Sequence, residues 1–192
     1  MSKKEALTRA AADLLWERGY TGTSPAMILD RAHAGQGSMY HHFSGKADLA
    51  IAAMTYMSDE LRSRAEGALA TGESAVARVT AFLDLERNPL AGCRMGRLTQ
   101  DHDVVADDGL RAPTADYFTW LAERLSAVLA DGVHTGELRP DTDPDAMAAL
   151  IMAAVQGGYV LARAHQDPAA FDQAINGAKQ VLASLAADVG QR

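Results

Sequence analysis

Apolar residues recur along most of this chain with the period of an α-helix. Near the N-terminus, Leu7, Ala11, Leu14 and Leu15 follow the i, i+4, i+7, i+8 spacing of one buried helix face. Eight later segments keep a helical period, and none alternates apolar and polar residues as a half-buried strand does. The pattern therefore predicts an all-α protein of about nine helices.

Residues with known preferences for helix ends set the expected boundaries. Gly19 suits the position after the first helix, and Thr23 or Ser24 caps the second, with Pro25 at its first position. Asp143-Pro144 and Asp167-Pro168 open the last two helices in the same way. The expected helices span about 3–18, 25–32, 36–42, 46–69, 76–83, 92–100, 110–132, 144–161 and 168–189.

These helices divide naturally into a small head and a larger body. A three-helix head would occupy residues 1–45, and a helical body residues 46–192. The long helix that starts near Lys46 would join them without a flexible linker.

Charge is spread unevenly between these two parts. The whole chain of 192 residues carries −7, but residues 1–48 hold six Lys/Arg against five Asp/Glu. Between Arg31 and Ala47 there is no carboxylate. Phosphate binding depends on the charge where contact occurs, so an acidic body does not exclude DNA as a partner.

Several global features point to the cytoplasm. The single cysteine, Cys93, cannot form an internal disulfide, which fits a reducing compartment. No uninterrupted apolar run reaches the 18 or so residues that would span a bilayer. The first residues, MSKKEALTRAAADLL, lack the apolar core of a signal peptide.

The most informative segment is residues 19–49. It carries G-Y-x-G-T-S-x-x-x-I-x-x-x-A followed by G-S-M-Y-H-H-F-x-x-K-x-x-L. Two short helices around a tight turn are typical of a helix-turn-helix, which places its second helix in the major groove. The segment resembles the DNA-binding head of the TetR family of transcriptional regulators. Its matching residues are Gly19, Tyr20, Thr23, Ser24, Ile28, Ala32, Gly37, Tyr40, His42, Phe43, Lys46 and Leu49.

The resemblance implies a homodimer whose two heads enter successive major grooves of a palindromic operator. It places Gln36 and Tyr40 at base edges and lets the backbone at Gly37 approach closely. The side chain of glutamine suits this role because it pairs bidentately with adenine. The residues expected to face DNA, most of them on phosphates, are Thr23, Ser24, Gln36, Gly37, Ser38, Tyr40, His41, His42 and Lys46.

Two positions depart from the family pattern. His33 stands in the turn where the family usually has glycine and where a positive φ is expected, and histidine is among the residues that tolerate it. Gly35 replaces the usual Ser or Thr cap of the recognition helix. The alternative is an ordinary helical subdomain, in which Phe43 is core and the head has no partner.

For the body, the resemblance implies a dimer interface on the last two helices and an effector pocket between the fifth and eighth. Both helices carry an apolar stripe with small residues that permit close approach, although such stripes also fit a monomer core. A small, largely apolar or aromatic effector is expected. Residues expected to contact it are Met95, Thr99, His102, Tyr117, Trp120, Gln156 and Tyr159.

Other chemistry is not indicated. Cys93 beside Arg94 is either a reactive thiol or a small buried residue. Asp101-His102-Asp103 reads as a solvated helix end, not a metal site, and no cofactor motif or catalytic motif such as G-x-S-x-G is present. The resemblance thus implies a ligand-responsive repressor without enzymatic activity. The alternative is an all-α ligand-binding or enzymatic protein with a purely structural head.

Overall fold

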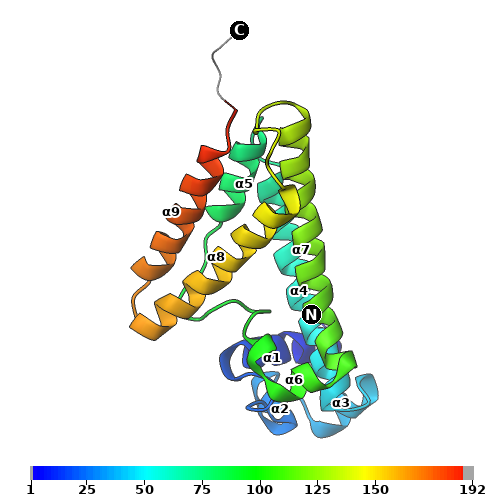
Figure 1. Cartoon of the computed structure of the whole chain (residues 1–192). Helices are drawn as coiled ribbons and strands as arrows, with labels where there is room; N and C mark the ends of the chain where they lie inside the picture. Colours follow the sequence, from blue (N-terminus) through cyan, green and yellow to red (C-terminus); the bar gives the residue numbers. More distant parts are fainter. Residues whose placement is uncertain (1, 188–192) are drawn as a thin grey trace. The chain divides into compact units, whose positions relative to one another are not determined.

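The computed structural model describes residues 2–187 and is all-α over that range (Figure 1). No strand occurs among these residues, only one isolated bridge between Leu138 and Ala186. The elements are α1 (Lys3–Arg18), α2 (Pro25–Arg31), α3 (Gln36–His42), α4 (Lys46–Leu69), α5 (Ala75–Leu83), the 3-10 turn η1 (Leu98–Gln100), α6 (His102–Ala106), α7 (Asp108–His134), α8 (Pro144–His165) and α9 (Ala169–Ser184).

One expected helix is wrong. The stretch expected as a helix over 92–100 is a series of turns that ends in η1, and the separate helix α6 follows. Gly92, with φ 85°, is not helical, and the residues after it close turns with bonds of the 3-10 type, such as that from the Leu98 N–H to the Met95 carbonyl at 3.1 Å. The Asp101 carboxylate then accepts a hydrogen bond from the Asp103 N–H and is the N-cap of α6. Val189, expected on the apolar stripe of the last helix, lies outside the described residues.

The chain forms two compact units. The first contains Met1–Leu61 and Cys93–Tyr117, and the second contains Arg62–Gly92 and Phe118–Arg192. The chain crosses between the two units three times: inside α4 after Leu61, in a loop between Gly92 and Cys93, and inside α7 after Tyr117. The functional division at residue 45 stays a prediction.

In the first unit, α1, α2 and α3 bury a common core. It is continued by the residue that ends α3 and by the first turn of α4. Its side chains, all at most 4% exposed, are Leu7, Ala11, Leu14, Leu15, Ile28, Met39, Phe43 and Leu49.

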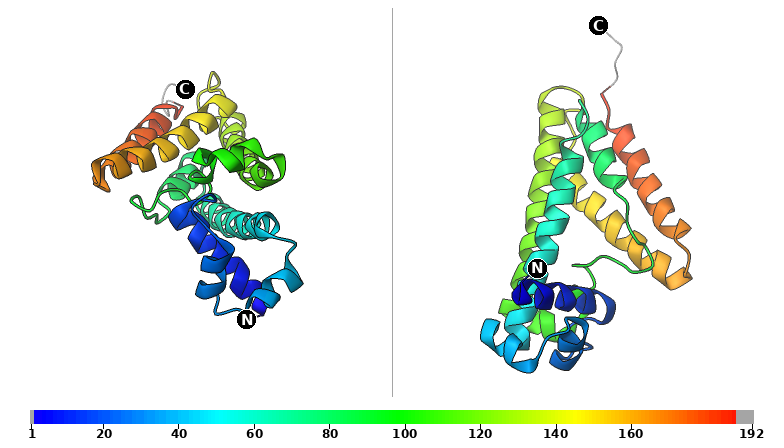
Figure 2. Two further views of the ribbon diagram at one scale, coloured as in Figure 1. Left: turned by 90° about the horizontal axis from the view of Figure 1, so that it is seen from below. Right: turned by 180° about the vertical axis from the view of Figure 1, so that it is seen from behind.

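In the second unit, α8 and α9 lie side by side (Figure 2). The Tyr159 and Phe171 ring centroids are 4.7 Å apart. A Cβ at Gly158 would lie 2.9 Å from the Phe171 ring, so glycine permits this close approach. By length and composition alone α8 would suit a membrane span, with mean hydropathy 1.4, a test that core helices of soluble proteins also pass.

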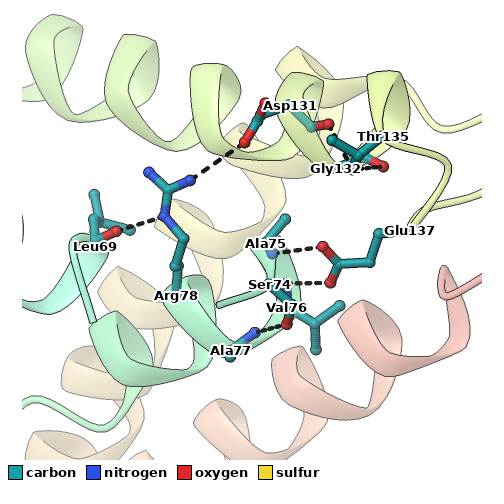
Figure 3. Close-up of polar contacts among 10 residues, drawn as sticks. All are labelled: Leu69, Ser74, Ala75, Val76, Ala77, Arg78, Asp131, Gly132, Thr135 and Glu137. Carbon is teal, nitrogen blue, oxygen red and sulfur yellow. Dashed lines mark hydrogen bonds and ion pairs between the residues drawn. The ribbon is translucent and has the colours of Figure 1, made fainter. Parts of the chain in front are cut away.

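Polar side chains bind the ends of two helices in the second unit (Figure 3). Glu137, after α7, accepts hydrogen bonds from the N–H groups of Ala75 and Val76 at 2.6 and 2.9 Å, at the start of α5. Arg78 donates to the Leu69 carbonyl at 2.7 Å, at the end of α4. Because the first N–H groups of a helix have no partner inside it, Glu137 supplies acceptors that α5 otherwise lacks.

We predict that Glu137→Ala lowers the free energy of unfolding by about 1–3 kcal/mol, because two part-buried N–H groups lose a charged acceptor. Chemical denaturation followed by circular dichroism measures this. Glu123→Ala, at an exposed position of α7, is the matched control and should change stability by under about 0.5 kcal/mol. Equal effects of the two substitutions would contradict the capping role.

Candidate functional site

The centre of the candidate site is α3, a helix of seven residues. Gly35 is its N-cap and makes no side-chain hydrogen bond, as the sequence indicates. Met39 and Phe43, four residues apart, are 0% and 4% exposed and anchor one side of the helix in the core. The opposite side is therefore held toward solvent.

That outer side presents the residues expected to read DNA. Gln36, Gly37, Tyr40, His41 and His42 are all exposed, and Tyr40 is 57% exposed in spite of its large ring. The His41 and His42 ring centroids are 4.8 Å apart. Ser38 is half-buried, near the start of the helix. The surface offers hydrogen-bond donors and acceptors and an aromatic ring, without a carboxylate from α3.

The turn before α3 has the backbone that the sequence predicts. His33 has φ 48°, so a non-glycine residue does occupy the left-handed conformation. The Ala34 N–H donates to the Leu29 carbonyl at 3.0 Å and closes the end of α2. The Lys3 ammonium donates to the His33 carbonyl at 3.3 Å, which ties this turn to α1.

At the start of α2, the two hydroxyl residues that were expected to hold phosphate differ in their roles and in their exposure. Ser24 is the N-cap, and its Oγ accepts from the Met27 N–H at 3.3 Å. Thr23 is 1% exposed, and its hydroxyl donates to the Gly19 carbonyl at 2.7 Å. In this conformation the Thr23 side chain stabilises the turn and is not directed to solvent.

Two cationic side chains of the head, Lys46 and Arg31, already contact neighbouring residues. The Lys46 ammonium lies 4.0 Å from the centroid of the Tyr20 ring. Burial, and then the carboxylates of α6 and its flanks, raise the pKa of Tyr20, so it stays a neutral phenol. Arg31 forms a bidentate pair with Glu17 at 2.7 and 2.9 Å, and this bond holds the pKa of Glu17 below its usual range.

The seven residues expected to contact an effector fall in both units. Met95, Thr99, His102 and Tyr117 belong to the first unit, and Trp120, Gln156 and Tyr159 to the second. Met95 and Tyr117 are buried, whereas Thr99 is exposed and the His102 side chain is 93% exposed. The remaining three are half-buried. Their role stays a prediction.

One group of contacts in the first unit is not predictable from the sequence. Arg94, Arg97 and Asp101 bind residues of the head that lie about eighty positions earlier. Asp101 is half-buried and bonded to Thr21, so the expectation of a solvated helix end is wrong for Asp101 and right for His102. A single sequence carries no signal for contacts at such separation.

Family comparisons agree with these features of the head and extend to the body. Residues 7–53 match the family described as "Bacterial regulatory proteins, tetR family". Residues 73–178 match the family described as "Tetracyclin repressor-like, C-terminal domain", which covers more than half of the chain.

Individual relatives match over most of their length. The chain is 29% identical over 171 residues to the transcriptional regulator AcuR of Cereibacter sphaeroides, covering 85% of this chain and 78% of that one. It is 30% identical over 175 residues to an uncharacterised helix-turn-helix regulator of Lactococcus lactis, with 85% of each covered. The crystal structure of a regulator from Chloroflexus aurantiacus aligns with TM-score 0.84 at 28% identity over 96% of each chain.

Proposed function

Because this chain belongs to the TetR family of transcriptional regulators, we propose that it is a homodimeric, ligand-responsive repressor of a palindromic operator. It is a DNA-binding regulator and not an enzyme. The family matched by the body is described as repressor-like, and this supports repression over activation. Its operator would be bound in the cytoplasm.

The DNA-binding site is proposed because α3 and its C-cap place two residues in the core while most other side chains of α3 are exposed. Met39 and Phe43 are buried in the core, and Gln36, Tyr40 and His42 are exposed on the rest of the helix surface. A helix placed in the major groove needs this arrangement, because base edges are read by side chains on a rigid support. In this proposal Gln36 and Tyr40 contact bases, and Ser24, Ser38, His42 and Lys46 contact phosphates.

We predict that Tyr40→Ala and Lys46→Ala each weaken operator binding by about tenfold, the loss of one good base or phosphate contact. Fluorescence anisotropy with a labelled operator duplex measures this at a fixed salt concentration. Far-ultraviolet circular dichroism should show an unchanged helix content. Unchanged affinity in both variants would contradict the proposed contact surface, and Val105→Ala, on exposed α6, is the control.

A second copy of this chain is the partner proposed for α8 and α9. The outer face of α8 carries Leu150, Val160 and Leu161, which are 46%, 64% and 47% exposed. A Cβ at Gly157, on the same face, would have no atom within 4 Å. Val181 on α9 is 42% exposed. Apolar helix faces with small residues between them are suited to a four-helix bundle between two protomers.

We predict that Leu161→Glu weakens dimer formation by at least about tenfold, since a carboxylate would be buried without a partner. Sedimentation velocity over a concentration series measures the dimer fraction. Val105→Glu is the matched control, because Val105 is equally exposed at 46% and lies on α6. A Leu161→Glu variant as dimeric as the parent protein, or a monomeric parent, would overturn this interface.

The effector is proposed to be small and largely apolar or aromatic, with one hydrogen-bonding group. Met95 and Tyr117 supply buried apolar surface in the first unit. The Thr114 hydroxyl in that unit is 3% exposed and makes no hydrogen bond to any other residue of 2–187. A buried hydroxyl in that state favours a ligand that provides a partner.

We predict that some members of a panel of small apolar and aromatic compounds release the labelled operator from the protein in an anisotropy titration. Thr114→Val should raise the concentration needed for half-release by about fivefold, the loss of one hydrogen bond, while affinity for the operator without effector stays unchanged. Glu123→Ala should leave both quantities unchanged. A panel without any active compound would count against this class of effector.

A further inference from the structure

The segment that precedes and starts α6 makes an unusual number of polar bonds to one small part of the head. Three of its side chains take part, and we call Arg94, Arg97 and Asp101 the clamp. All its contacts lie within the first compact unit. Most of them converge on α1 and on the turn of residues 19–23 that leads into α2, and Arg94 also donates to Glu60 of α4 at 2.8 Å.

The first part of the clamp binds the end of α1. The Arg97 guanidinium donates to the Trp16 carbonyl and, at 3.1 Å, to the Glu17 carbonyl. The last carbonyls of a helix lack intrahelical donors and carry partial negative charge, so a cation there is favourable. Arg94 lies 4.9 Å from the centroid of the Trp16 ring and pairs with Asp13 at 3.2 Å.

The second part binds the turn itself. The Asp101 carboxylate accepts from the Thr21 N–H at 2.9 Å and from the Thr21 hydroxyl at 2.8 Å. Burial raises the pKa of Asp101, but these bonds outweigh it and hold the pKa below its usual range. The clamp therefore bonds both hydrogen-bond donors of Thr21.

The turn that is held in this way is already tight. Gly19 has φ 75°, and a Cβ there would lie 3.1 Å from the Asp101 carboxylate. A Cβ at Gly22 would lie 2.5 Å from the Arg18 carbonyl oxygen. Ser24, the cap of α2 and a proposed phosphate contact, comes only two residues later. The direction in which α2 starts thus depends on a turn that is constrained by its own close backbone packing and by the bonds of Asp101 to Thr21.

We propose that the clamp positions the start of α2 for DNA binding, with Asp101 and Thr21 as its key pair. This inference rests on the proposed DNA-binding function and adds positioning residues that do not touch DNA. The clamp predicts that loss of the Asp101 carboxylate lowers affinity for DNA, whereas electrostatic repulsion alone predicts that the same loss raises it. Thr21 lies within about 10 Å of Ser24 by chain length, so a carboxylate bonded to it repels nearby phosphates. Loss of that charge alone would tighten binding, whereas loss of positioning weakens it.

The test is a double-mutant cycle on operator affinity, measured by fluorescence anisotropy well below the unfolding temperature. We expect Asp101→Ala to weaken binding by about tenfold and Thr21→Val by about threefold, with the double variant no weaker than Asp101→Ala. Asp101→Asn, which keeps one acceptor oxygen, should recover part of the loss. Amide hydrogen exchange at Thr21 should accelerate in the Asp101 variants.

Asp143→Ala is the matched control, because Asp143 is also an aspartate N-cap but belongs to α8 in the other unit. It should lose stability yet bind operator within about twofold of the parent protein. Should Asp101→Ala fail to fold, Asp101→Asn and Thr21→Val carry the test.

The outcomes separate the two claims. A parent protein that binds no duplex overturns the proposed function and this inference with it. A parent that binds, with Asp101→Ala folded and binding equally or more tightly, overturns the clamp alone. Additive losses in the double variant would also overturn it, because they would mean that Thr21 and Asp101 act separately.

Discussion

The head depends on the burial of Met39 and Phe43 behind α3, the proposed recognition helix. A helix of seven residues is too short to be stable by itself in water, so α3 exists because its inner side chains enter the core formed by α1. The same burial leaves Tyr40 and the neighbouring histidines facing outward. Stability and the presentation of the proposed DNA-reading surface therefore come from one packing interaction, and a change in the core would alter both.

Polar contacts orient the backbone where apolar packing does not. Apolar burial sets how deeply α3 sits, but the orientation of the turn before α2 is determined by directional bonds. Thr23 bonds to Gly19 within that turn, and the clamp binds it from a segment about eighty residues later. In the second unit, Glu137 and Arg78 connect helix ends by bonds of the same kind. Each unit thus relies on charged side chains that bond to backbone groups at helix ends.

The sequence predicted what local chemistry determines. The bounds of α1 and α3, the Ser24 cap and the positive φ of His33 all agree with expectation, since each depends on residues within one or two turns. The expected helix over 92–100 was wrong because Gly92 takes a left-handed φ and the residues after it form turns and η1, which the helical period of apolar residues does not reveal. Burial of Thr23 and the bonds of Asp101 depend on distant residues, and one sequence does not reveal those. Which residues contact an effector stays a prediction for the same reason.

The central claim is that the outer side of α3 reads a DNA sequence. Selection of bound duplexes from a random oligonucleotide pool by the purified protein tests it most directly. We expect enrichment of a palindrome whose half-sites lie about one helical turn, 34–36 Å, or a multiple of it apart, as two heads in successive major grooves require. No enrichment at low salt, where phosphate contacts are strongest, would contradict the claim.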